Sequence, residues 1–292
     1  RQIRNEFGVT PADGETAGGL GGYRISENIG SLNNLPLDNG IPQSGTIRFS
    51  HFYSKKLNIV VKCTGGNLGK ANYEAHGQVV GTASGISKSR PSRSSGGWQG
   101  GKKIFINITG TYSSNGASRN DWAFKTRSTG YWPGGTDMTI DVSSSGNVVG
   151  RGGNGGNASG GDGGNGSNGL RYMNGAQLNN GGYISAGGGG GGGGSRAEQN
   201  DWGDRNDAEG GGGGGGNGLP AGRGGSGNGR GAAGSKTNGG QGRSGEDDAE
   251  AEGGNGGNGG SNGGNGQDAN GGRNKKERNG RGGEGGKTTE TY

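Results

Sequence analysis

Glycine dominates the second half of the chain. Of the 83 glycines in 292 residues, 58 fall between Gly150 and Tyr292. Because glycine has no side chain to bury and loses more backbone freedom on folding than any other residue, this half cannot build an ordinary apolar core. It must either stay disordered or be ordered by something other than apolar packing.

The glycines recur with a period of three, as Gly-Gly-Asn repeats near Gly152 and Gly253 show. Three residues per turn is the period of the polyproline II helix, whose free backbone N–H and C=O groups can pair with neighbouring helices. Because any Cβ would push crowded helices apart, unbroken glycine predicts interior helices, while Asn, Ser or Arg predicts outward positions. We therefore expect residues 187–194 and 210–216 to be innermost. Composition alone also fits a flexible linker.

Charge is divided unequally between the two halves. Residues 151–292 carry 14 Lys and Arg against 15 Asp and Glu, so the first half, by subtraction, carries 16 against 9. Arg-Gly-Gly triplets, which can bind single-stranded nucleic acid, begin at Arg151, Arg223 and Arg281. Acidic residues nearly cancel these arginines and few aromatic residues accompany them. We expect no nucleic-acid partner.

No residue pattern indicates catalysis or a bound cofactor or metal. Cys63 is the one cysteine, which excludes an intramolecular disulfide and a zinc site with cysteine pairs. Neither His51 nor His76 has a neighbour that would form a recognisable nucleophile–base pair. No apolar run reaches 18 residues, so we expect no insertion into a membrane. The sequence favours a binding or structural protein rather than an enzyme.

Residues 54–149 are expected to form a small β domain. Runs rich in β-branched residues predict its principal strands at 57–63, 103–109 and 137–142. Shorter candidates lie at 78–80, 122–125 and 148–149. We expect the resulting sheet to pack on the base of the glycine-rich part.

Residues 1–53 have too few apolar residues to fold alone and are expected to dock on a partner. Residues 3–8 read I-R-N-E-F-G, and residues 41–53 read I-P-Q-S-G-T-I-R-F-S-H-F-Y, with strand-like alternation over 46–50. This pair of segments resembles a short module of tail and tail-fibre proteins of double-stranded DNA bacteriophages. The resemblance implies attachment to a tail-fibre or baseplate protein through Ile3, Phe7, Ile47, Phe49, Phe52 and Tyr53.

A second resemblance covers about half the chain. The segment G-R-G-G-N-G-G at 150–156, the segment N-N-G-G-Y-I at 179–184 and the polyglycine runs broken by polar stretches are similar to receptor-binding adhesins at the long tail-fibre tips of T-even-like phages. That family implies a sandwich of polyglycine II helices over residues 150–292. It also implies a virion protein that binds an outer-membrane protein or a surface polysaccharide of the host.

Polar stretches between the glycine runs are the candidate receptor-binding loops, since loops at the end of a rigid scaffold commonly carry recognition. They comprise residues 195–209, 232–238, 246–252 and 267–279. Trp202 is the candidate anchor, since tryptophan is enriched at binding hot spots, and the alternative is that it folds back over the glycine bundle. The other candidate contacts are Arg196, Arg205, Asp247, Asp248, Lys275, Lys276 and Arg278.

The predicted fold is mostly β and irregular, with an N-terminal attachment module, a small β domain and a polyglycine II sandwich. A structural virion component with the same fold and no receptor, such as a baseplate, fibre-hinge or decoration protein, is the alternative function. Ice binding is a weaker alternative, because an ice face would be flat and weakly charged.

Overall fold

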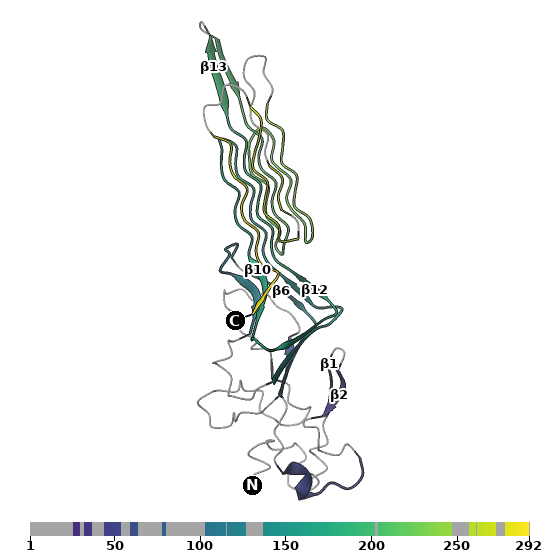
Figure 1. Cartoon of the computed structure of the whole chain (residues 1–292). Coiled ribbons are helices and arrows are strands. Elements are labelled where there is room, and N and C mark those ends of the chain that lie inside the picture. The colour runs from purple at the N-terminus through teal and green to yellow at the C-terminus, as the bar shows by residue number, and fades with distance from the viewer. Residues whose placement is uncertain are drawn as a thin grey trace.

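A computed structural model describes residues 26–29, 32–36, 44–53, 59–63, 78–79, 103–114, 116–126, 137–201, 204–246, 257–260, 262–272 and 278–291. These residues form a small β structure from which a long bundle of glycine segments extends (Figure 1). None of the helices in this part of the chain has the length and apolar character needed to span a bilayer.

The β structure consists of three stacks of parallel strands. One contains β3 (Ile59–Cys63), β5 (Lys103–Ile108), β8 (Asp137–Val142) and β11 (Gln177–Asn180), with β4 (Gln78–Val79) antiparallel at its edge. The second contains β6 (Thr111–Ser113), β9 (Asn147–Val149) and β12 (Tyr183–Ser185). The third contains β7 (Trp122–Lys125), β10 (Asn168–Tyr172) and β15 (Thr289–Thr291). Because successive strands enter successive stacks, the chain winds as a short three-sided solenoid.

Apolar side chains of the solenoid strands form its core. Ile106, Ile140 and Val142 lie on one face of the largest sheet and are at most 1% exposed. They belong to one buried cluster with Tyr112 and Phe124, whose rings meet edge to face at 5.2 Å. The six strand segments that the sequence predicts all coincide with observed strands, because their β-branched and aromatic residues suit a buried pleated surface.

The glycine bundle extends from one corner of the solenoid. The connection from β9 to β10 makes one excursion along the bundle, and the connection from β12 to β15 makes the remaining passages. Strands on both sides of residue 150 therefore share the same sheets. We call the end of the bundle near these sheets the sheet end and the opposite end the far end (Figure 1).

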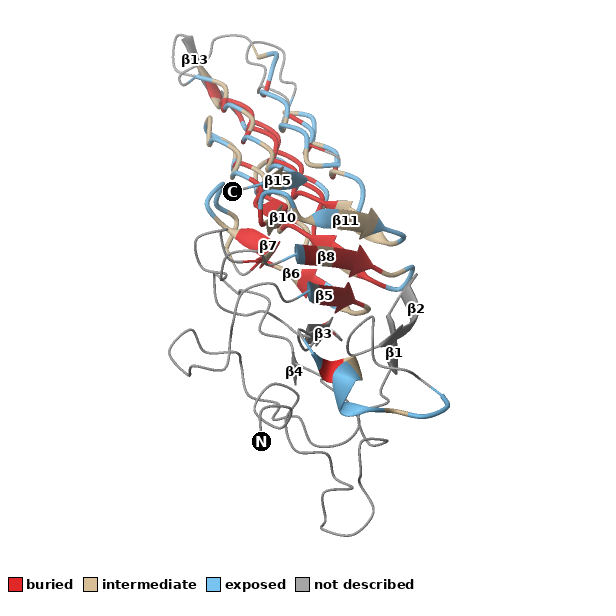
Figure 2. Ribbon diagram, turned by 60° about the horizontal axis from the view of Figure 1, so that its bottom comes forward, coloured by how far each residue is buried: buried red, intermediate tan, exposed pale blue. Residues whose placement is uncertain are grey.

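Residues 187–194 and 210–216 are buried throughout and run up the middle of the bundle (Figure 2). Three successive glycines of the first run form backbone hydrogen bonds with six different segments, two for each glycine. The partners are Ser167 and Gly286 for Gly187, Asn217 and Gly153 for Gly188, and Gly264 and Gly260 for Gly189. The pattern then repeats from Gly190. The predicted interior position of both runs is confirmed, and the period of three is the one that polyglycine II helices require; their helical pitch stays a prediction.

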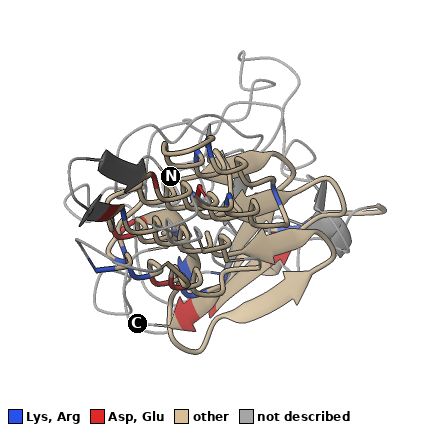
Figure 3. Ribbon diagram, turned by 90° about the horizontal axis from the view of Figure 1, so that it is seen from above, with Lys and Arg blue, Asp and Glu red and all other residues tan. Residues whose placement is uncertain are grey.

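These bonds arrange the bundle in three layers. Residues 150–157, 161–167 and 221–226 form one outer layer, and residues 239–244, 257–260 and 264–270 form the other. The middle layer holds the two interior runs flanked by 230–235 and 278–287. Viewed from above, the segments lie side by side (Figure 3). A Cβ on Gly190 would lie 1.9 Å from the backbone oxygen of Asn154, so the spacing between layers excludes any side chain there.

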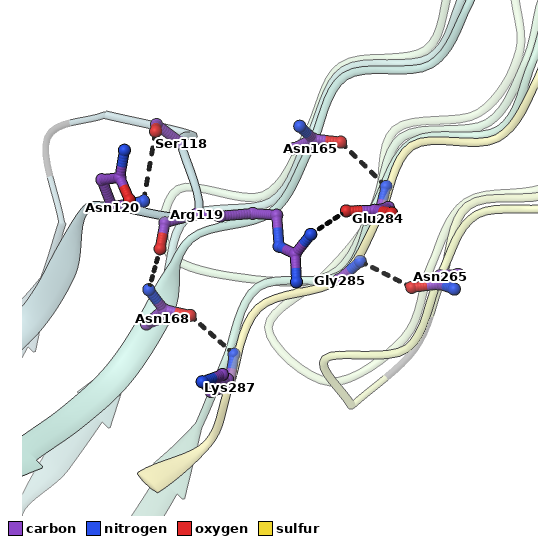
Figure 4. A network of polar contacts seen from close by, with 9 residues as sticks. All are labelled: Ser118, Arg119, Asn120, Asn165, Asn168, Asn265, Glu284, Gly285 and Lys287. Carbon is purple, nitrogen blue, oxygen red and sulfur yellow. Dashed lines mark hydrogen bonds and ion pairs between the residues drawn. The ribbon is translucent and has the colours of Figure 1, made fainter. Parts of the chain in front are cut away.

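Side chains of Asn and Asp hold the outer segments together. Asn165 Oδ1 accepts the backbone N–H of Glu284 at 2.9 Å, and Asn265 Oδ1 accepts that of Gly285 at 2.9 Å (Figure 4). The same contact joins Asn154 to Arg223, Asn157 to Ser226, Asp162 to Arg281, Asn168 to Lys287, Asn258 to Gly242 and Asp268 to Gly282. Apart from Asn168, which is buried, these Asn residues occupy exposed positions as predicted, and all of them satisfy an N–H group of a neighbouring segment.

Near the N-terminus, β1 (Ser26–Ile29) pairs with β2 (Leu32–Pro36), and η3 is a short 3-10 helix over Phe49–Phe52. The strand-like prediction for residues 46–50 is wrong, since η3 begins at Phe49 and residues 46–48 are irregular. The His51 side chain accepts the N–H of Arg48 at 3.1 Å, which favours the helical turn over an extended chain. The division at residues 53 and 149 into three domains stays a prediction.

Candidate functional site

Turns from separate passages of the chain meet at the far end of the bundle. Ser159 donates its N–H to Gly194, Ala158 donates to Ser226, and Glu246 donates to Glu209. Asn279 joins this group because its side chain accepts from Ser195 and donates to Gly271. The far end is therefore one surface built from segments that are widely separated in sequence.

A β-hairpin projects from this surface (Figure 1). It consists of β13 (Ala197–Asp201) and β14 (Asp204–Ala208), paired antiparallel from Ala197 opposite Ala208 to Asp201 opposite Asp204. The first pair, Ala197 and Ala208, is fully buried and covers the ends of the interior runs. Residues 195–209 do connect the interior runs at an end of the bundle, as expected, but residues 197–208 form a hairpin rather than an irregular loop. The reason is that the interior runs bring both ends of the segment side by side, where they can pair.

The hairpin brings acidic residues opposite one another. Glu198 pairs in register with Asp207, and Asn200 pairs with Arg205. The buried pair of Ala197 and Ala208 anchors the hairpin at its base.

Asp162 and Arg278 form an ion pair at the far end. Arg278 donates from Nη1 and Nη2 to the two carboxylate oxygens, each at 2.9 Å, and the backbone N–H of Arg281 donates to Oδ1 at 2.8 Å. Hydrogen bonds from Arg278 lower the pKa of Asp162 to about 2, assisted by that from Arg281. The same ion pair raises the pKa of Arg278. Both side chains remain more than half exposed, so a partner could still reach them.

The structure groups several predicted contact residues. Arg196 is half-buried at the start of the hairpin, Arg205 lies on β14, and Arg278 is committed to its pair with Asp162. Five others, Trp202, Asp247, Asp248, Lys275 and Lys276, lie outside the described residues. The residues that border these gaps, Asp201, Glu246 and Arg278, all belong to the far end.

Residues 232–238, a predicted turn at an end of the bundle, lie at the sheet end. The Lys236 ammonium group bonds to Asn147 on β9 and lies 4.6 Å from the centre of the Tyr183 ring on β12. Asn217 reaches the backbone of Lys236 from the interior run. This segment fastens the bundle to the solenoid.

Asp162 was missed as a far-end residue, whereas Asn279 lies in the predicted loop 267–279 but was not among the candidate contacts. Asp162 lies three positions before exposed Asn165, so the three-residue period was a signal that could have placed it outward. Its pairing with Arg278 spans 116 positions of sequence and left no local signal. No group of three or more His, Cys, Asp or Glu residues in the described ranges could hold a metal ion.

The predicted attachment residues are divided between surface and core. Phe49 and Tyr53 are 65% and 73% exposed, Ile47 is partly exposed and Phe52 is buried. Ile3 and Phe7 lie outside the described residues. In Figure 1, η3 lies at the opposite end of the molecule from β13.

Residues 75–291 match the family model described as phage tail fibre adhesin Gp38. A crystal structure of the gp37-gp38 adhesin tip complex of the bacteriophage S16 long tail fibre is similar to the chain, with 20% identity and a TM-score of 0.44. The similarity covers 87% of this chain and 84% of that one. No curated protein sequence matches the chain.

Proposed function

The chain belongs to the phage tail fibre adhesin family, and we propose that it binds a host cell-surface receptor through the far end of its glycine bundle. The observation that carries this proposal is the gathering of the β13–β14 hairpin and several polar turns on one surface. That surface lies away from the solenoid and η3 (Figure 1).

The scaffold suits recognition because its rigidity limits the entropy lost on binding. Each end of the hairpin continues into a run whose backbone groups are paired on all sides. Loops anchored in this way lose less conformational freedom when a partner binds than loops on a mobile chain do. Their mixed charges and amide groups fit an outer-membrane protein or a surface polysaccharide.

Attachment to the tail fibre is the second part of the proposal. Two aromatic side chains, Phe49 and Tyr53, stand in solvent while Phe52 of the same turn is buried. Exposed aromatic residues of this kind are common anchors in protein interfaces. The partner would be a tail-fibre protein of the same virion, as in the complex named for the S16 fibre.

The test is adsorption of the full-length protein to host cells. In one variant residues 199–206 are exchanged for an unrelated polar hairpin of equal length, which keeps the buried Ala197 and Ala208. In the control, exposed Thr237 at the sheet end is changed to Ala. Binding should be saturable, should require one surface receptor and should be lost only in the hairpin variant.

A structural virion component with no receptor is the alternative. It predicts that neither the folded wild-type protein nor either variant binds host cells. If the hairpin variant still binds host cells saturably, the receptor site lies in another part of the protein.

A further inference from the structure

Charge is segregated across the bundle, although the glycine half is nearly neutral as a whole. Residues 210–245 contain Arg223, Arg230, Lys236 and Arg243 and no Asp or Glu. After the second interior run, these residues fold into the three neighbouring segments 221–226, 230–235 and 239–244. They wrap one edge of the bundle, which we call the cationic edge.

The opposite edge has mixed and paired charges. There Asp162 pairs with Arg278, Glu284 pairs with Arg119, and Glu290 pairs with Lys287. Opposite charges at short range cancel, so this edge exerts little field on its surroundings. These three ion pairs therefore lie away from the cationic edge.

The three arginines of the cationic edge are exposed. Within the described residues, no carboxylate forms an ion pair with Arg223, Arg230 or Arg243. Glu246 follows three positions after Arg243, and its carboxylate accepts the backbone N–H of Glu209 at 3.2 Å. Lys236 is bound to Asn147, which leaves the arginines as the available cations.

The scaffold fixes the positions of these arginines. Gly225 donates its N–H to Gly213, Gly231 donates to Gly225, and Arg243 donates to Gly212, so each segment is tied to its neighbours. The Arg243 side chain lies against Gly229, where an added Cβ would be 2.9 Å from Nε. The three segments are adjacent, since Gly231 donates to Gly225 and Ala232 donates to Gln241. An anionic surface that covers this edge therefore meets all three of them.

We propose that the cationic edge binds phosphate groups on glycans of the host cell surface. This inference rests on the proposed function, which brings the protein to that surface. Guanidinium groups match phosphate oxygens in geometry and form two parallel hydrogen bonds with them. Contacts along the side of the bundle would orient the fibre while the far end engages its specific receptor.

Nucleic acid fits this edge less well than a phosphorylated glycan. Arg-Gly-Gly segments bind single strands as mobile chains assisted by aromatic stacking. Here Arg223 precedes Gly225, which is fixed by its bond to Gly213, and the segments 221–226, 230–235 and 239–244 contain no aromatic residue.

The experiment measures binding of full-length protein to vesicles that contain phosphorylated lipopolysaccharide. Vesicles with the same lipopolysaccharide after removal of its phosphate and a single-stranded oligonucleotide are the comparison probes. The edge variant carries Arg223→Gln, Arg230→Gln and Arg243→Gln. The control carries Arg119→Gln, Arg281→Gln and Lys287→Gln, which remove the same charge from the opposite edge. Thermal unfolding verifies that both variants are folded.

The edge variant should bind phosphorylated vesicles about tenfold more weakly, since three exposed contacts contribute a few-fold each. The control should change by less than about twofold, and binding should fall steeply with added salt. No binding at low salt, equal loss in the control, or equal binding to dephosphorylated vesicles or to the oligonucleotide would overturn the proposal. The hairpin exchange should leave vesicle binding intact, so failure of the receptor site and failure of the edge give different results.

Discussion

The side-chain carbonyl oxygen of Asn154 accepts a hydrogen bond from the backbone N–H of Arg223 at 3.0 Å. The two residues lie on adjacent segments of one outer layer. A similar contact, from the N–H of Arg281 to Asp162, shows that a carboxylate can take the place of the amide. Asn at this position of the repeat is thus a structural acceptor.

The first prediction concerns this acceptor. Asn154→Leu should lower the free energy of unfolding by about 1 kcal/mol, because it removes one hydrogen bond at the surface. Asn154→Asp should cost less, since it keeps an acceptor beside a cation. Chemical denaturation of the two variants gives the comparison. Equal losses would mean that the contact contributes nothing.

The second prediction concerns the interior runs. Gly190→Ala places a Cβ 1.9 Å from the backbone oxygen of Asn154 and should cost about 3 kcal/mol or more, since backbone in a paired layer cannot move aside. Gly181→Ala is the control, because its Cβ would meet the nearest atom at an ordinary 3.4 Å. Thermal unfolding should separate the two clearly. A Gly190 variant as stable as the control would refute close packing of the layers.

The third prediction concerns the stability of the protein at low pH. The folded-state pKa of Asp162 is lowered to about 2, so its contribution to stability is present above its ordinary pKa near 4 and is lost as pH falls towards 2. Asp162→Asn keeps an acceptor for Arg281 but removes the charge. The stability difference between wild type and this variant should therefore shrink between pH 4 and pH 2. Solvent screening keeps the whole effect below about 1 kcal/mol. A difference that is constant over this range would contradict the ion pair.

The fourth prediction concerns Cys63. Burial raises the pKa of its thiol to about 12, with a smaller opposing effect from a hydrogen bond with Tyr112. Because the thiolate is the reactive form, a thiol reagent at pH 8 should modify Cys63 only after unfolding. Stability should also fall as pH rises above about 9, since the unfolded chain then releases a proton that the folded chain retains. Rapid labelling of folded protein would place Cys63 at the surface.

The fifth prediction concerns attachment. Phe49→Ser and Tyr53→Ser remove exposed aromatic groups, so they should leave thermal stability unchanged and reduce incorporation into virions. Phe52→Ser should instead destabilise the segment, because Phe52 is 6% exposed. Quantifying the protein in purified particles gives the readout. Full incorporation of the double variant would exclude this surface from the attachment site.

Local pattern predicted the parts of the fold that depend on local chemistry. Unbroken glycine located both interior runs, and β-branched residues located β3, β5 and β8. The β13–β14 hairpin could not be predicted, since Glu, Asp and Asn disfavour strands and its pairing is imposed by the runs that lead into it. The pair of Asp162 and Arg278 likewise depends on which passages become neighbours. Composition could not reveal the cationic edge. The Lys and Arg of the glycine half nearly balance its Asp and Glu in number, and only the fold shows that the residues of the cationic edge lie together.

The period of three in the interior hydrogen bonds limits how the length of a glycine run can change during evolution, but it does not limit the length of the hairpin. Each glycine run can gain or lose three residues and leave every remaining N–H facing its former partner segment. A change of one or two residues would turn the whole run away from its partners. The hairpin between the runs meets no such constraint beyond its first alanine pair. Descendants of this protein should therefore vary their tips in any length and sequence, while their glycine runs change length only in steps of three.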